Sequence, residues 1–142
     1  MVDTVAEHIA ALKDEDWAIR EEAAVTLGTF RDPRAVLPLV SLLRDTDRAV
    51  REAAIGALTA IGEPSVPVLG LCLSDPQPGV QEAASSVLAS IADERVLAPL
   101  IAALVNRDWI VRMHAAKALG RIKDASAIEP LIPLLQDKVK AV

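Results

Sequence analysis

The chain has 142 residues, of which 52% are apolar and only 2% aromatic, and its 20 acidic and 15 basic residues give a net charge of −5. This length suits one domain with a sizeable core, and the apolar content excludes a disordered chain. The acidic balance disfavours a nucleic-acid-binding protein, because phosphate contacts require clustered lysine and arginine. The single cysteine, Cys72, excludes an internal disulfide, and the acidic N-terminal segment lacks a signal-peptide pattern, so we expect a cytoplasmic protein. The longest uncharged stretches, 64–74 and 96–106, are too short to span a membrane.

Residues 1–15 are predicted to form one helix that caps the N-terminal end of the fold. Val5, Ile9 and Leu12 place apolar side chains on one face at helical spacing. Thr4 and Glu7 have the spacing of a capping box, which predicts that this helix begins near Thr4.

Four similar segments follow, at 16–46, 47–76, 77–107 and 108–137, and residues 138–142 match the start of a further, truncated repeat. Equivalent apolar anchors recur at separations of 31, 30 and 31 residues, at Ile19, Val50, Val80 and Val111. Each segment carries two apolar stripes at helical spacing, and a proline stands near the start of the second stripe, where a missing N–H is least costly. The sequence therefore predicts an all-α superhelix of four helical hairpins plus an N-terminal half-repeat, which forms a single domain over residues 1–142.

The shared pattern is D-x-x-[IV]-R-x-x-A-A-x-A-L-G, followed after a turn by A-[VI]-x-P-L-[IV]-x-L-L-x-D. Over nearly the whole chain it resembles the HEAT-like repeats first associated with phycobilisome lyases, the PBS lyase HEAT-like repeat family. The resemblance implies an armadillo-like solenoid. It also implies a choice of functions, because proteins with these repeats include scaffolds, adaptors, lyase subunits and several enzymes.

The residues themselves give no catalytic motif, and we expect no enzyme activity, no cofactor and no metal site. The two histidines, His8 and His114, lie 106 positions apart, more than three repeats, so they cannot share a metal within one chain. Deoxyhypusine hydroxylase has a similar architecture and binds iron through His-Glu dipeptides, which are absent from this sequence. His114 aligns with Glu22 and is predicted to lie on the surface, whereas Cys72 aligns with core leucines and is predicted to be buried.

The predicted function is non-catalytic binding of a protein partner in an inner groove formed by the second helices. Alternatives left open are a bilin lyase-type subunit, and a repeat module of a larger or a designed protein. The groove positions are uncharged in the middle two repeats, which is typical of an interaction site. The predicted partner-binding residues are Leu37, Ser41, Arg44, Leu71, Ser74, Ala102, Val105 and Glu129.

Acid–base pairs four residues apart open three of the four repeats, and they predict a structural ladder that holds neighbouring repeats in place. Its members are Asp16 with Arg20, Asp47 with Arg51, and Asp108 with Arg112. In the third repeat both members change together, to Gln77 and Gln81, which indicates that the two side chains contact either one another or the same ladder in adjacent repeats. Arg51 is predicted to bridge aspartates at the inter-repeat turns.

Charge is unevenly spread along the chain: residues 1–47 carry 10 acids and 5 bases, whereas residues 109–142 carry 3 acids and 6 bases. Together with apolar side chains in the last repeat, this distribution predicts a homodimer or an end-to-end association through the C-terminal repeat.

Overall fold

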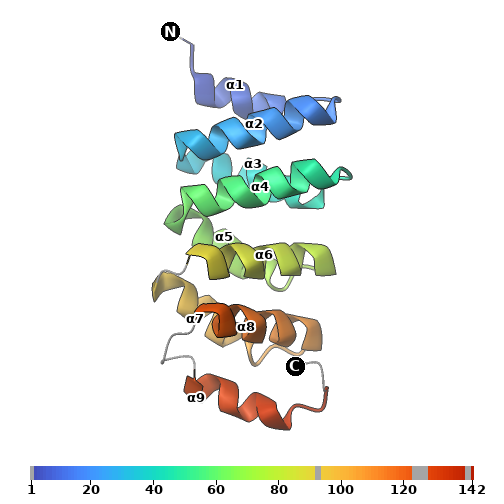
Figure 1. Cartoon of the computed structure of the whole chain (residues 1–142), viewed down its shortest axis with the longest axis vertical. Coiled ribbons are helices and arrows are strands. Elements are labelled where there is room, and N and C mark those ends of the chain that lie inside the picture. Colours follow the sequence, from blue (N-terminus) through green and yellow to red (C-terminus); the bar gives the residue numbers. More distant parts are fainter. Residues whose placement is uncertain (1, 92–93, 123–127, 140–141) are drawn as a thin grey trace. The chain divides into compact units, whose positions relative to one another are not determined.

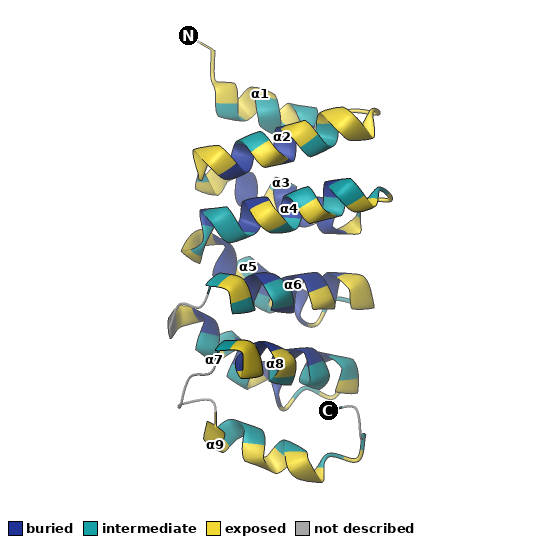
Figure 2. Ribbon diagram, in the orientation of Figure 1, coloured by how far each residue is buried: buried dark blue, intermediate teal, exposed yellow. Residues whose placement is uncertain are grey.

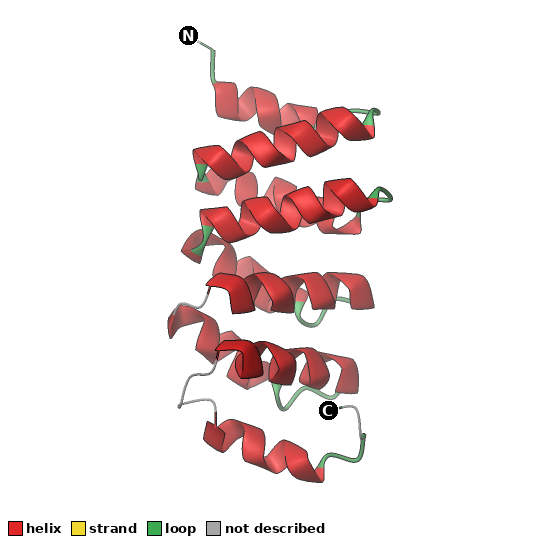
Figure 3. Ribbon diagram, in the orientation of Figure 1, coloured by secondary structure: helices red, strands yellow, loops and turns green. Residues whose placement is uncertain are grey.

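A computed structural model describes residues 2–91, 94–122, 128–139 and 142, and the elements in these ranges are all helical (Figures 1 and 3). The chain divides into two compact units, Met1–Val68 and Leu69–Val142. The all-α architecture of successive helical hairpins predicted from the repeats is confirmed. The predicted start of a truncated repeat is described only at residues 138, 139 and 142.

The first unit holds an N-terminal helix followed by a long first helix, a short second helix and another long first helix. Its α-helices are α1 (Thr4–Ala11), α2 (Trp17–Phe30), α3 (Val36–Ser41) and α4 (Arg48–Ile61), with 3-10 turns at Pro33–Ala35, Leu42–Arg44 and Glu63–Ser65. The long helices α2 and α4 pack side by side, and α1 packs on α2 (Figure 1). Helix α5 (Val66–Cys72) continues from the first unit into the second.

The second unit repeats this arrangement after α5. Its helices are α6 (Pro78–Ile91), α7 (Glu94–Ala103), α8 (Trp109–Ile122) and α9 (Ile128–Leu131), and a 3-10 turn, Ile132–Gln136, follows α9. Helix α8 packs against both α6 and α7. Most second helices are therefore short α-helices flanked by 3-10 turns, and a proline at the first or second position of several of these turns has no N–H to leave unpaired.

Equivalent leucines of the first helices form the core of each unit: Leu27 and Leu58 in the first, and Leu88 and Leu119 in the second, are at most 1% exposed. Figure 2 shows buried residues in dark blue on these helices. The aligned anchors Val50, Val80 and Val111 are buried as well. Ile19 is the exception, because its side chain remains 41% exposed. In the described chain only α1 precedes α2, so α2 has no earlier first helix to cover this position.

Aspartates begin the long helices. The carboxylates of Asp16, Asp47 and Asp108 accept hydrogen bonds of 2.8–2.9 Å from the backbone N–H two residues further on, which satisfies one of the free donors of the first turn. The prediction for α1 was wrong in one respect: its N-cap is Asp3, which accepts from Ala6 N, and Thr4 is already the first helical residue.

Close packing of α2 on α4 depends on Gly28. A Cβ atom at this position would lie 3.0 Å from the Cα of Ala57, so the absence of a side chain allows the two backbones to approach. Helix α4 ends at Gly62, whose φ of 78° is in the region that favours glycine. Among the described residues, no single helix is long and apolar enough to cross a membrane, although the bent pair Arg48–Ile61 and Glu63–Cys72 meets the length and composition criteria jointly.

Candidate partner-binding surface and turn ladder

Large apolar side chains project into solvent from the second helices. Leu37 in α3 is 65% exposed, Leu71 in α5 is 79% exposed, and Val105, which follows α7, is 85% exposed. Each lies beside fully buried neighbours, such as Leu39 and Leu69. The buried face of each second helix therefore supplies the core, and an apolar strip is left on its other face.

The remaining predicted surface residues are also exposed, in both units. Ser41 and Arg44 accompany Leu37 in the first unit, and the Ser41 hydroxyl donates to the Leu37 carbonyl oxygen at 3.3 Å. Ser74, Ala102 and Glu129 lie in the second unit. We call Leu71, Ser74, Ala102 and Val105 the Leu71–Val105 surface.

The two turns that flank the Leu71–Val105 surface are joined directly. The side-chain amide of Asn106 donates to the hydroxyl of Ser74 at 3.2 Å, although the two residues are 32 positions apart. Val105 precedes Asn106, so this contact brings together the two ends of the surface that come from successive repeats. The surface carries no charged side chain, and its chemistry is that of an apolar docking site with one hydroxyl at its edge.

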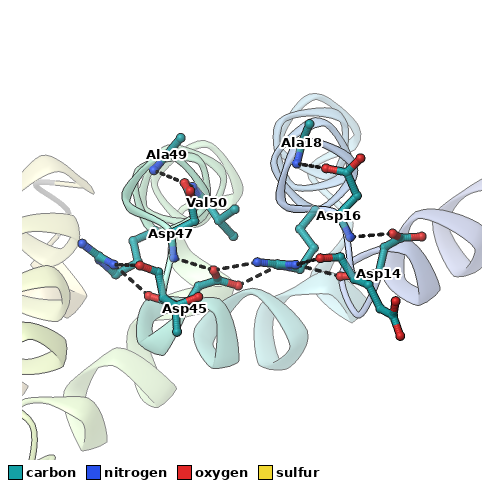
Figure 4. Close-up of polar contacts among 11 residues, drawn as sticks. Asp14, Asp16, Ala18, Asp45, Asp47, Ala49 and Val50 are labelled. Atoms are coloured by element: carbon teal, nitrogen blue, oxygen red, sulfur yellow. Dashed lines mark hydrogen bonds and ion pairs between the residues drawn. The ribbon is translucent and has the colours of Figure 1, made fainter.

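Arginine side chains connect successive turns, as Figure 4 shows for the first unit. The guanidinium of Arg20 donates from Nε and Nη2 to the two carboxylate oxygens of Asp45, at 2.9 and 3.0 Å. Its Nη1 donates to the carbonyl oxygens of Asp14 and Glu15, at 2.8 and 3.0 Å. The two side chains are only 14% and 9% exposed, so this bidentate pair is largely shielded from water.

The same arrangement recurs in the second unit. Arg112 binds both carboxylate oxygens of Asp137, at 2.7 and 3.1 Å, and the carbonyl oxygens of Asn106 and Arg107. Arg51 likewise donates to two carbonyl oxygens five and six residues before it, those of Thr46 and Asp45. We call these arginines with their acceptors the turn ladder.

The partners in the turn ladder differ from the expected pairs. The carboxylates of Asp16, Asp47 and Asp108 bind the N-termini of their own helices. The arginine instead pairs with an aspartate 25 residues further on; in the first unit this is Asp45, two positions before the helix cap Asp47.

Sequence reasoning missed Asp45 and Asp137, the carboxylates that bind the arginines. The signal was present, because an acid-x-acid spacing recurs at Asp14–Asp16 and Asp45–Asp47, and the first carboxylate of each pair also accepts the N–H of the second. One aspartate in each pair therefore folds the turn and the other caps the helix.

The third repeat has an uncharged version of the ladder. Gln81 stands in place of the arginine and donates to the Asp75 carbonyl oxygen at 2.6 Å, while Asn106 stands where the other repeats have the paired aspartate. The side-chain Oδ1 of Asn106 still accepts the N–H of Asp108 and folds the turn. Gln81 is only 2% exposed, and its Oε1 is buried with no hydrogen-bond partner.

Burial and the arginine act in opposite directions on Asp45. Burial raises the pKa of this carboxyl, but the hydrogen bonds from Arg20 and from the Asp47 N–H outweigh burial and hold the pKa below its ordinary value. The hydrogen bonds from Arg112 likewise lower the pKa of Asp137. Both carboxylates are therefore charged at neutral pH and remain so into mildly acidic solution.

His114 is not on the surface as predicted, because it is only 7% exposed and faces a pocket between α6 and α8. Cys72 is buried, as predicted. His8 is partly exposed and packs edge-on against Phe30, with ring centroids 5.6 Å apart. Among the described residues, no group of three or more His, Cys, Asp or Glu side chains could hold a metal ion.

Comparisons with a family model and with curated proteins both identify HEAT repeats in this chain. The family model described as HEAT repeats matches residues 5–86 and 66–142. The HEAT repeat-containing taxis protein of Halobacterium salinarum is 30% identical over 87% of this chain, and deoxyhypusine hydroxylase of Rattus norvegicus is 46% identical over 42% of it. The aligned regions cover 36% and 20% of those two proteins, so the chain spans about a third of the first and a fifth of the second.

Solved structures agree with this assignment. The complex of CpcE and CpcF of phycocyanin lyase from Nostoc sp. PCC7120 contains a chain that is 28% identical, with a TM-score of 0.59, over 99% of this chain and 61% of that one. An engineered protein is 25% identical, with a TM-score of 0.51, over 99% of this chain and 75% of that one. The family model covers most of the chain and its helical hairpins recur in these structures; the chain belongs to the family of HEAT repeat proteins.

Proposed function

We propose that this chain is a non-catalytic binding module that holds a protein partner on the exposed faces of its second helices. The observation that carries the proposal is the exposure of Leu71 and Val105, at 79% and 85%, on a surface without charge. A water-facing position in a helical repeat would ordinarily be lysine or glutamate, so exposed apolar side chains at equivalent faces favour an interaction site.

The partner that best fits this chemistry presents an apolar helix or an extended apolar segment. Large apolar side chains of such a segment would bury Leu71 and Val105, and Ser74 would offer a hydroxyl at the edge. Leu37 and Ser41 offer the same chemistry within the first unit. Arg44 in the first unit and Glu129 in the second are exposed charged residues that we include among the partner contacts of their own units.

The relatives support a partner without identifying it. The phycocyanin lyase structure is a complex of two chains, CpcE and CpcF, so a protein similar to this chain is found together with another protein. Because this chain spans only part of its curated relatives, it also fits a module that works within a longer protein. We propose that the interaction takes place in the cytoplasm, in keeping with a sequence that contains a single cysteine, Cys72.

The second candidate is a bilin lyase-type subunit, which is favoured by the likeness to the phycocyanin lyase chain over 99% of the sequence. Mixing the purified chain with a bilin distinguishes the two functions. A shift of the visible absorbance band would favour the lyase-type subunit, and an unchanged spectrum would favour the protein-binding module.

Self-association through the last repeat is a further part of the proposal. Leu135 is 87% exposed and Ile132 is 56% exposed, and both lie in the final 3-10 turn. Contact between these apolar side chains would give a dimer that persists at high salt, whereas an end-to-end contact between acidic and basic repeats would weaken with salt. A monomeric mass in light scattering at high protein concentration would contradict both arrangements.

The decisive experiment compares the wild type with the double variant Leu71→Glu, Val105→Lys. The immobilised chain captures proteins from native lysate, the captured protein is identified by mass spectrometry, and the purified partner is then titrated against each variant. We expect the double variant to keep its melting temperature and to lose the partner. Val25→Glu is the matched control, because Val25 is 54% exposed on a first helix.

Two results would contradict the proposal. Equal affinity of the wild type and the double variant for the purified partner would exclude the Leu71–Val105 surface. A collapsed melting curve of the double variant, with Val25→Glu unaffected, would show that these side chains stabilise the fold instead.

A further inference from the structure

A small polar pocket lies between the first helices α6 and α8 of the second unit, with a volume of about 70 Å³. Helix α6 supplies one carboxylate and two hydroxyls, and α8 supplies an imidazole and two cations. Its lining residues are Glu82, Ser85, Ser86, His114, Lys117 and Arg121. This volume is well below the roughly 300–1,000 Å³ of pockets that bind drug-sized ligands, so the space suits a small ion.

The basic side chains of this pocket are peculiar to α8. His114, Lys117 and Arg121 occupy three positions on one face of the helix, spaced i, i+3 and i+7. With the repeat separations of 31, 30 and 31 residues, the equivalents are Glu22, Val25 and Thr29; Ala53, Gly56 and Ala60; and Ala83, Ser86 and Ser90. None of these nine residues is basic.

The matching position in the first unit shows what the fold alone requires. Between α2 and α4 lies a wider groove of about 520 Å³, and its lining includes Ala53, Gly56 and Ala60. Small apolar residues are therefore sufficient to pack one first helix against the next. The imidazole and the two cations of α8 are additions that helix packing does not need.

His114 is the most telling of these groups, because its imidazole lines the pocket and has no hydrogen-bond partner among the described residues. Its side chain is only 7% exposed, it lines the pocket, and no described residue forms a hydrogen bond with its ring nitrogens. A buried polar group ordinarily has a hydrogen-bond partner, and one that lacks a partner in a pocket is satisfied by whatever fills the pocket.

Lys117 and Arg121 are also available. Both are exposed at the rim of the pocket, and within the described part of the chain no carboxylate lies at ion-pair distance from either cation. They carry two positive charges, against the single negative charge of Glu82. The Ser86 hydroxyl adds a neutral donor on the facing helix.

We propose that the α6–α8 pocket binds a small tetrahedral oxyanion, with Lys117 and Arg121 neutralising its charge and His114 donating a hydrogen bond from within. Charge-assisted hydrogen bonds from lysine and arginine are the usual means of holding such a group. This site lies on the first helices and is independent of the partner-binding surface on the second helices.

Binding of the anion is linked to protonation of His114. Burial lowers the pKa of His114; the facing Glu82 raises it and Lys117 lowers it, while Arg121 lies further along the same face. A bound anion favours the imidazolium, so binding takes up a proton. Affinity for an ion that does not itself titrate, such as sulfate, is therefore expected to fall as pH rises through the titration of His114.

The test is calorimetric titration of the purified chain with sulfate and with inorganic phosphate, at low ionic strength and at two pH values. We expect saturable binding that tightens at the lower pH, and a roughly three- to tenfold loss of affinity for Lys117→Ala or Arg121→Gln. His114→Ala, which places at this position the residue found at Ala53 and Ala83, should bind more weakly and lose the pH dependence for sulfate. Glu82→Gln should bind more tightly, because it removes a repelling charge.

A titration with phenyl phosphate distinguishes a free ion from the phosphoryl group of a larger molecule. Affinity equal to that of phosphate would mean that the pocket accepts a phosphoryl group from outside, whereas no binding would restrict it to free ions. Lys138→Gln is the control, since Lys138 is an exposed lysine outside the pocket. Absence of saturable binding, or an equal loss of affinity in Lys138→Gln and Lys117→Ala, would overturn the proposal.

Discussion

Arg20 and Asp45 are 25 positions apart in the sequence, and their side chains are joined by two hydrogen bonds of 2.9 and 3.0 Å. The pair connects the turn before α2 to the turn before α4 (Figure 4). Because the same guanidinium also binds two carbonyl oxygens of its own turn, one side chain holds both turns in a fixed relation. The contact is stronger than an ordinary surface ion pair, since it is bidentate and mostly shielded from water.

Replacing Arg20 should therefore destabilise the fold. We expect Arg20→Ala to lower the melting temperature by several degrees, because Asp45 and two turn carbonyl oxygens would lose their donor. Arg48→Ala is the control, since the Arg48–Glu52 pair is an exposed contact within one helix and should contribute little. Thermal unfolding followed by circular dichroism measures both variants, and equal melting temperatures would show that the turn ladder does not stabilise the protein.

Restoring the charged ladder in the third repeat should stabilise the second unit. The double variant Gln81→Arg, Asn106→Asp recreates the pair seen at Arg112 and Asp137 and removes the unpaired Oε1 of Gln81. We expect a favourable coupling of about 0.5–3 kcal/mol between the two changes in a double-mutant cycle of unfolding free energies. Additive effects would mean that the two side chains do not meet.

The uncharged ladder also makes a prediction for the wild type. In hydrogen exchange, the turn before α8, where Asn106 stands in place of the paired aspartate, should open more readily than the turn before α4, whose Asp45 is bound to Arg20. Equal protection of the two turns would contradict this order.

Acid should weaken the ladder in a defined range of pH. The pKa values of Asp45 and Asp137 lie below the ordinary value in the folded chain, so their contribution is fully present above about pH 4 and is lost as pH falls through the lowered pKa values. Urea unfolding at several pH values measures this loss. Asp45→Asn should have lower stability at neutral pH and a smaller further decrease in acid, and an unchanged decrease would argue against the pairing.

Two glycines should respond oppositely to the same substitution. Gly28→Ala places a Cβ 3.0 Å from the Cα of Ala57, and we expect a net loss of about 1–2 kcal/mol after the gain in helix propensity. Gly56→Ala meets nothing within 4 Å, and the helix propensity of alanine should then stabilise the chain by about 1 kcal/mol. Chemical denaturation of both variants tests the signs, and a stabilising Gly28→Ala would show that α2 and α4 can separate without cost.

The sequence was sufficient to predict the repeats, the hairpins and the buried leucines, because each rests on a period repeated four times. It left open whether each arginine pairs within its own repeat or with the adjacent one, since Asp16 and Arg20 have the spacing of a helical ion pair. The cap geometry directs Asp16 to the backbone, and Arg20 binds Asp45 of the next turn. The sequence did contain a signal for the observed pairing. In the third repeat the arginine is replaced by Gln81 and its partner aspartate is replaced by Asn106, so the two positions change together.

The error at His114 has a different origin. Its surface position was predicted from the aligned Glu22, but α2 has only α1 before it in the described chain, whereas α8 packs against α6. Equivalent positions in an end repeat and an internal repeat thus meet different surroundings. The same reason explains why Ile19 is exposed while Val50 and Val111 are buried.

The side-chain pairs of the turn ladder all run in one direction along the sequence, from an arginine to an aspartate nearer the C-terminus. Arg20 and Arg112 each bind the aspartate of the following turn, so a repeat of this charged type carries the arginine of one pair, and the next turn carries its aspartate. Duplicating or deleting a whole repeat of this type would leave each internal arginine with an aspartate to bind in the following turn. Arrays of different length could then arise from one pattern of turns, with the contacts between successive turns unchanged. An insertion inside a turn would separate an arginine from its aspartate, so it would be far more disruptive than the gain or loss of an entire repeat.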